Sequence, residues 1–141
     1  MSRSTIAVAD MSEPTHLEHA VLHALLDGDH PVLEALRDQL RGLSVAHRIV
    51  TPTSFSTVLR PGRGAARAPV PAPRVVLDDL HADVPGLPGG AAFALFVDDG
   101  WLSRLEGSTF ARETWPEDLA GFTLHLEDPE RDLSDLDPPG L

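Results

Sequence analysis

Residues 91–107 read Ala-Ala-Phe-Ala-Leu-Phe-Val-Asp-Asp-Gly-Trp-Leu-Ser-Arg-Leu-Glu-Gly and decide the fold class. Two runs with apolar side chains at alternate positions flank an Asp-Asp-Gly turn, which is the pattern of a β-hairpin. A hairpin cannot bury one apolar face on its own. The stretch therefore predicts an antiparallel sheet with something packed against it.

The register of this hairpin depends on the length of its turn. A three-residue loop over 98–100 pairs Val97 with Trp101 and keeps one face mostly apolar. A two-residue loop over 99–100 instead turns the charged Arg104 toward that face. Because one face must be buried, the three-residue loop is expected.

Outward from the hairpin, the pattern predicts more strands and, before them, two helices. Further strands are expected at 46–50, 54–60, 75–84 and 122–126. Thr15 and Glu18 form a capping-box signature for a helix that ends at Leu26. A second helix begins at His30-Pro31 and ends at Gly42. The expected fold is α+β, with an N-terminal helical hairpin packed on an antiparallel sheet of four to six strands.

The 141 residues suit one domain. Residues 15–126 are expected to form it, after a disordered lead over 1–14. Residues 61–73, rich in Pro, Gly and Arg, predict a mobile loop. Residues 127–141 predict a loose acidic tail.

Composition excludes several classes of function. The net charge is −11, which argues against nucleic-acid binding and against attraction to anionic membranes. The absence of cysteine excludes thiol chemistry and disulfides. No signal peptide and no long apolar segment is visible, so the cytoplasm is the expected compartment.

The charges are unevenly distributed along the chain. Residues 39–77 contain six arginines and no acid, whereas residues 117–141 contain eight acids and one arginine. Either the two segments neutralise each other, or the surface carries two signs of charge for a partner. For the second case, the predicted partner-binding residues are Glu117, Asp118, Glu127 and Asp128, which flank the last strand, and Trp101.

One group of residues indicates a metal site as an alternative. His81 and Asp83 share a face of a predicted strand, and with His125 they outline a two-histidine, one-carboxylate site. Arg131 is followed by Asp and Leu, so the Arg-x-Ser expected downstream in such enzymes is missing. A polar strand edge explains the same residues, and no cofactor is expected.

Residues 95–107, followed by Thr109-Phe110 and Trp115-Pro116-Glu117, resemble a family of small uncharacterised bacterial proteins. The helical stretch over 26–40 resembles the same family. Size, helix-then-sheet layout and acidity are similar to immunity proteins of bacterial toxin systems. The resemblance implies a stoichiometric inhibitor and brings no catalytic residues.

The sequence therefore predicts a non-catalytic protein-binding module, of the kind that neutralises a cationic toxin by occlusion. The alternatives are a metal-dependent enzyme using His81, Asp83 and His125, and a structural subunit of a bacterial assembly. The oligomeric state is left open.

Overall fold

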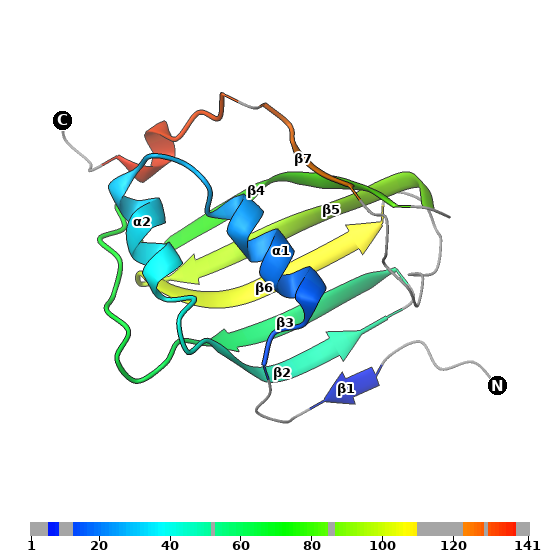
Figure 1. The fold of residues 1–141 in the computed structure, drawn as a ribbon, viewed down its shortest axis with the longest axis horizontal. Coiled ribbons are helices and arrows are strands. Elements are labelled where there is room, and N and C mark those ends of the chain that lie inside the picture. Colours follow the sequence, from blue (N-terminus) through cyan, green and yellow to red (C-terminus); the bar gives the residue numbers. More distant parts are fainter. Residues whose placement is uncertain are drawn as a thin grey trace.

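The computed structural model describes residues 6–8, 13–51, 53–84, 87–109, 123–128 and 130–137. In these ranges, two α-helices lie over one face of a seven-stranded antiparallel sheet (Figure 1). The α+β class is thus confirmed. The sheet has more strands than the expected four to six, because a strand at Ile6–Val8 joins its edge.

The order of helices and strands along the chain agrees with the hydrophobic patterns of the sequence. The helices are α1 (His16–Leu25), α2 (Pro31–Asp38) and a short 3-10 helix, η1 (Ser134–Leu136). The strands are β1 (Ile6–Val8), β2 (Ser44–Val50), β3 (Ser54–Arg60), β4 (Arg74–Val84), β5 (Leu87–Asp98), β6 (Trp101–Thr109) and β7 (Thr123–Leu126). Their order in the sheet is β1-β2-β3-β6-β5-β4-β7, so the β5–β6 hairpin lies inside the sheet and β7 at its edge.

Both helices begin where their caps predict. The Thr15 hydroxyl accepts a hydrogen bond from the Glu18 N–H, and Glu18 Oε1 accepts one from the Thr15 N–H, at 3.1 and 2.8 Å. His30 Nδ1 accepts a hydrogen bond from the Val32 N–H at 3.1 Å and caps α2, with Pro31 at its first position. The second helix ends at Asp38, before the predicted end at Gly42.

The turn between β5 and β6 contains two residues, Asp99 and Gly100, so the predicted three-residue loop is wrong. Their φ angles are 52° and 84°, which is the left-handed geometry of a tight hairpin turn. An additional residue, Ser103, then forms a β-bulge in β6. The bulge restores the alternation, and Leu105 lies opposite Leu95 on the buried face.

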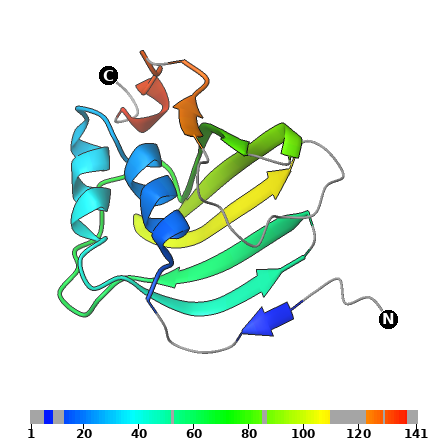
Figure 2. The same cartoon turned by 45° about the vertical axis from the view of Figure 1, so that its right-hand side comes forward.

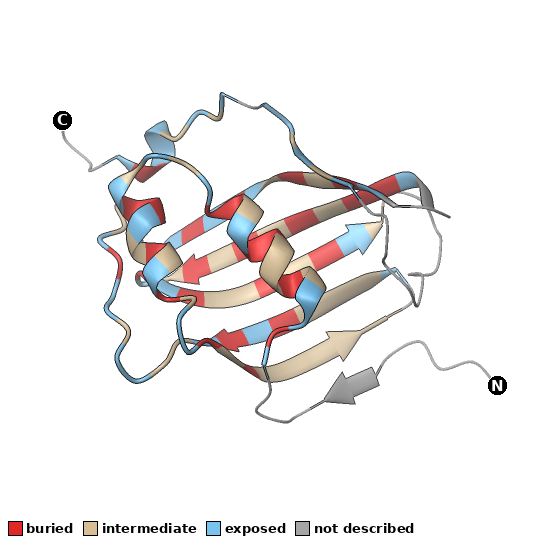
Figure 3. Cartoon of the chain, in the orientation of Figure 1, coloured by how far each residue is buried: buried red, intermediate tan, exposed pale blue. Residues whose placement is uncertain are grey.

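The core lies between the helices and the sheet, where buried positions alternate along the central strands (Figure 3). Gly107 matches this packing, because a Cβ there would overlap the ring of Phe55. The centroid of that ring is 6.2 Å from the centroid of the Phe93 ring. A glycine in β6 therefore makes room for an aromatic pair above it.

Three segments that the sequence predicts to be disordered, mobile or loose contact the rest of the fold. Within 1–14, β1 pairs with β2. Within 61–73, Ala68 is 2% exposed and donates its N–H to the β5–β6 turn. Within 127–141, Leu136 is 2% exposed and belongs to the core cluster. Hydrogen bonds and isolated apolar side chains offset the cost of ordering these Pro-rich or acidic stretches.

Candidate functional site

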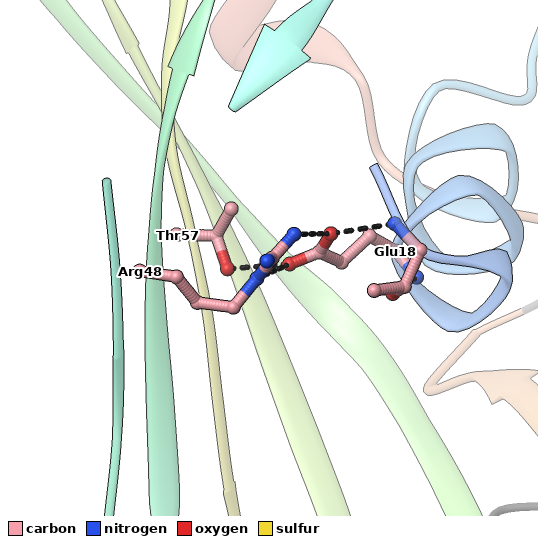
Figure 4. Close-up of polar contacts among 4 residues, drawn as sticks. Glu18, Arg48 and Thr57 are labelled. Atoms are coloured by element: carbon pink, nitrogen blue, oxygen red, sulfur yellow. Dashed lines mark hydrogen bonds and ion pairs between the residues drawn. The ribbon is translucent and has the colours of Figure 1, made fainter. Parts of the chain in front are cut away.

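A buried ion pair joins the first helix to the sheet (Figure 4). Glu18 is 3% exposed. Its Oε1 accepts a hydrogen bond from Arg48 Nη2 at 2.7 Å, and its Oε2 accepts from Arg48 Nε at 3.0 Å and from Thr57 Oγ1 at 2.6 Å. Arg48 comes from β2 and Thr57 from β3, so one carboxylate connects α1 to two strands.

The environment of Glu18 keeps it ionised. Burial acts to raise its pKa, but the hydrogen bonds from Arg48, Thr57 and Thr15, with the charge of Arg48, outweigh burial. The pKa therefore lies below its usual value. Because both oxygens already accept hydrogen bonds from the protein, this carboxylate holds the helix in place and is no proton acceptor for a substrate.

The three residues of the alternative metal site lie close together at the edge of the sheet. His81 on β4 lies opposite His125 on β7, with their rings stacked at 6.0 Å between centroids. His81 Nε2 is 3.0 Å from an oxygen of Glu127, and His125 Nδ1 is 3.9 Å from an oxygen of Asp83. Each histidine thus faces a different carboxylate. Across the described residues, no three His, Asp or Glu side chains are arranged to hold a metal ion.

A groove of about 300 Å³ separates the outer part of β4 from the C-terminal segment. Its lining, which we call the acidic groove, consists of residues 75–79 of β4 together with Glu127, Asp128, Arg131, Asp132, Leu133, Asp135 and Leu136. Six carboxylates and one guanidinium line it. The groove therefore combines a strong negative charge with a partly apolar surface.

Arg131 holds the C-terminal side of the acidic groove in place. Its Nε and Nη2 donate to the two oxygens of Asp79 at 2.7 and 2.8 Å, and its Nη1 donates to the Asp27 carbonyl at 2.6 Å. The Arg131 side chain is only 6% exposed. At the far end of this segment, His30 Nε2 lies 3.0 Å from an oxygen of Asp137. These contacts fix the described part of the chain after β7, including η1, against β4 and the loop between the helices (Figure 2).

Among the described residues, no cation forms an ion pair with four of the carboxylates around the acidic groove. Asp79 is neutralised by Arg131, and Glu127 lies beside His81. The others are all exposed and form no ion pair within the described part of the chain: Asp78, Asp128, Asp132 and Asp135. The N–H and the hydroxyl of Ser134 hold the pKa of the Asp132 carboxyl below its usual value.

Two of the six arginines in residues 39–77 bind carboxylates elsewhere. Arg48 binds Glu18 on α1, and Arg74 Nε lies 2.7 Å from an oxygen of Asp98 on β5. Within the described residues, none of the six arginines forms an ion pair with the carboxylates of Asp78, Asp128, Asp132 or Asp135. Mutual neutralisation between the arginine-rich stretch and the acidic C-terminal stretch, one of the two interpretations of the sequence, therefore does not account for the groove.

The predicted partner-binding residues do not all lie at one place. Glu127 and Asp128 line the acidic groove. Trp101 lies at the hairpin turn opposite Asp98 and is 36% exposed. Glu117 and Asp118 lie outside the described residues.

Sequence reasoning missed Asp78, Asp132 and Asp135 as part of this site. The last two were assigned to a loose tail, where ordering entropy would weaken their effect. A signal was present in Leu133 and Leu136, two apolar residues three positions apart among acids. That spacing is typical of a short helical turn with one buried side.

No family model, no curated protein and no solved structure matches this chain. The resemblance to small bacterial α+β proteins and to immunity proteins therefore stays a prediction. Among the described residues, there is also no helix with the length and apolar character needed to cross a membrane.

Proposed function

We propose that this protein is a non-catalytic binding module that captures a cationic segment of a partner protein, as an immunity protein of a bacterial toxin would, and that it acts in the cytoplasm. The observation that supports this most directly is the set of four free carboxylates, Asp78, Asp128, Asp132 and Asp135, gathered around one groove. The N-terminal helical hairpin and the sheet on which it packs are the scaffold of this site.

The position of these acids matters more than the total charge of the protein. Carboxylates grouped within about one Debye length, about 8 Å at physiological salt, act together on an approaching cation. Leu136 and Arg131 already hold the C-terminal acids in place, so binding does not have to order that segment. Electrostatic attraction of this kind raises the association rate and the selectivity of a complex.

The test compares two variants that change the net charge equally. One variant carries Asp78→Asn, Asp128→Asn, Asp132→Asn and Asp135→Asn. The matched control neutralises four exposed acids on the helices and their flanks: Glu13→Gln, Asp29→Asn, Glu34→Gln and Asp38→Asn. Association with a fluorescent oligo-arginine peptide is measured by stopped-flow from low to physiological salt.

We expect the groove variant to associate about tenfold more slowly than the control at low salt, and the difference to shrink as salt rises. Equal slowing in both variants would show that only the net charge attracts the peptide, and the proposed function would then be wrong.

A metal-dependent enzyme stays the alternative, favoured by one observation. His81, Asp83 and His125 do meet on adjacent strands. Their contacts with separate carboxylates, and the position of His125 on an edge strand half exposed to solvent, are equally typical of a polar strand edge.

A further inference from the structure

We infer that the outer edge of β4, over residues 74–78, binds an extended basic peptide by strand addition, with the peptide lying in the acidic groove. This rests on the proposed function for the charge of the partner, and it adds the binding mode and the shape of the bound segment. Strand addition draws its affinity from main-chain hydrogen bonds and its selectivity from alternate side chains.

The first observation is that β4 is longer than β7, its neighbour at the edge of the sheet. Within the described residues, β7 pairs with β4 from Leu80 to Asp83. The Glu127 N–H still donates to the Asp79 carbonyl at 2.8 Å, and the chain then leaves the edge. On the side away from β5, no described strand pairs with residues 74–78.

The second observation concerns the direction of the main-chain groups. The Asp99 N–H donates to the Pro73 carbonyl at 2.7 Å, which makes Pro73 and Asp99 a hydrogen-bonded pair of the β4–β5 ladder. Such pairs alternate with pairs that form no hydrogen bond to each other. The regular register then makes Val76 and Phe96 a pair of the second type. The N–H and carbonyl of Val76 therefore point away from β5, into the groove.

The third observation is that the groove matches one kind of strand. Successive side chains of an added strand alternate between the two faces of the sheet, so every second one meets the same wall. The C-terminal wall offers Asp128, Asp132 and Asp135 beside Leu133. A peptide with Arg or Lys at alternate positions and β-branched residues between them would match both the charge and the edge.

A second copy of this chain fits the edge less well. Edge-to-edge pairing of two copies would bring two acidic grooves together, and like charges placed opposite each other are unfavourable. The same carboxylates thus favour a basic strand and oppose self-association through this edge.

The experiment selects peptides from a displayed library of random 12-residue sequences, using the whole protein as bait. Binding of the selected peptides is then measured by fluorescence anisotropy against two variants. Val76→Pro removes the outward N–H without removing a bond to β5, and Val76→Ala shortens the same exposed side chain but keeps the N–H. Peptides N-methylated at alternate residues test the same hydrogen bonds from the other side, whatever Val76→Pro does to folding.

We expect the selected peptides to be basic at alternate positions and to bind Val76→Pro about tenfold more weakly than Val76→Ala. Of the two sets of alternate residues that can be N-methylated, one should give a similar loss of affinity, because its N–H groups face β4. Basic peptides that bind without regard to Val76→Pro and N-methylation would overturn strand addition and leave the proposed function intact. Edge-dependent peptides without basic residues would overturn the cationic partner instead.

Two further outcomes overturn the inference as a whole. Failure to enrich any peptide means that the edge does not accept a strand. A concentration-dependent dimer that Val76→Pro dissociates would assign the edge to a second copy of the chain.

Discussion

At the scale of single residues, Glu18 makes stability depend on pH. Its pKa is lowered in the folded state, so the ionised carboxylate stabilises the fold above the pKa of the unfolded chain. This contribution is lost as pH falls through the lower folded-state pKa. We expect Glu18→Gln to lower the free energy of unfolding by about 1–3 kcal/mol at neutral pH. Urea unfolding of both proteins at decreasing pH should show the difference shrinking toward zero, and a difference that stays constant would contradict this role.

The same residue shows what a sequence can predict about polar contacts. Thr15 and Glu18 are three positions apart, so the capping box is visible in the sequence. The partners Arg48 and Thr57 are 30 and 39 positions from Glu18. Nothing in a local pattern pairs residues over that distance, and Arg48 was counted only as part of the arginine-rich stretch.

At the scale of elements, the loop over 61–73 is attached to the hairpin turn through Gln39, which is fully buried at the end of α2. Its Nε2 donates to the carbonyls of Ala66 and Gly100 at 2.9 and 2.8 Å, and its Oε1 accepts the Leu102 N–H at 2.9 Å. One amide side chain therefore joins a helix end, the loop and the turn between β5 and β6.

We therefore expect that replacing residues 61–73 by a Gly-Ser sequence of equal length lowers the melting temperature, although the composition of this stretch predicts a mobile loop. The replacement removes the buried side chain of Ala68 and displaces the Ala66 carbonyl from Gln39. We expect these losses to lower the free energy of unfolding by about 1–3 kcal/mol. For a chain of this size, each 1 kcal/mol shifts the midpoint by roughly 3–5 °C. Arg63→Ser is the control, because Arg63 is exposed in the same loop. A melting temperature equal to that of the control would support the mobile loop that the sequence predicts.

The elements that the sequence predicts well are those with a single uninterrupted period. Both helices begin at the expected positions, and the strand at Ser54–Arg60 has the expected bounds. The β5–β6 register differs from the expected one, because a two-residue turn replaces the expected three-residue loop, and the bulge at Ser103 then returns Leu105 to the buried face. A second irregularity lies in β4 between Leu77 and Leu80. Parity arguments assume an unbroken strand, and a bulge leaves no mark in composition.

At the scale of the whole molecule, the strand order places the acidic C-terminal segment beside the β4 edge of the sheet. The strand order puts β4 beside the short β7, and the chain after β7 returns along β4 with its acids. The surplus of acids in this segment is visible in the sequence, but their composition predicts a loose tail. The contacts that order them come from residues far away in the chain, Asp27, His30 and Asp79.

This arrangement makes Arg131 the residue on which the acidic groove depends. Arg131→Ala leaves Asp79 without its cation and frees the segment from the Asp27 carbonyl. We expect the amide of Leu136, which donates to the Leu133 carbonyl at 3.0 Å, to exchange with solvent about tenfold faster, while amides of the β5–β6 hairpin keep their protection. Hydrogen exchange measured by NMR reports both regions in one sample.

The control is Glu130→Ala, a change at an exposed neighbour. If exchange at Leu136 is the same in both variants, packing of Leu133 and Leu136 alone holds the segment. Association with the oligo-arginine peptide should then be faster in Arg131→Ala than in the control, because the four free carboxylates keep their places and Asp79 loses its cation. If exchange rises only in Arg131→Ala, association with the peptide should slow in that variant too, since its acids would have to be ordered again on binding.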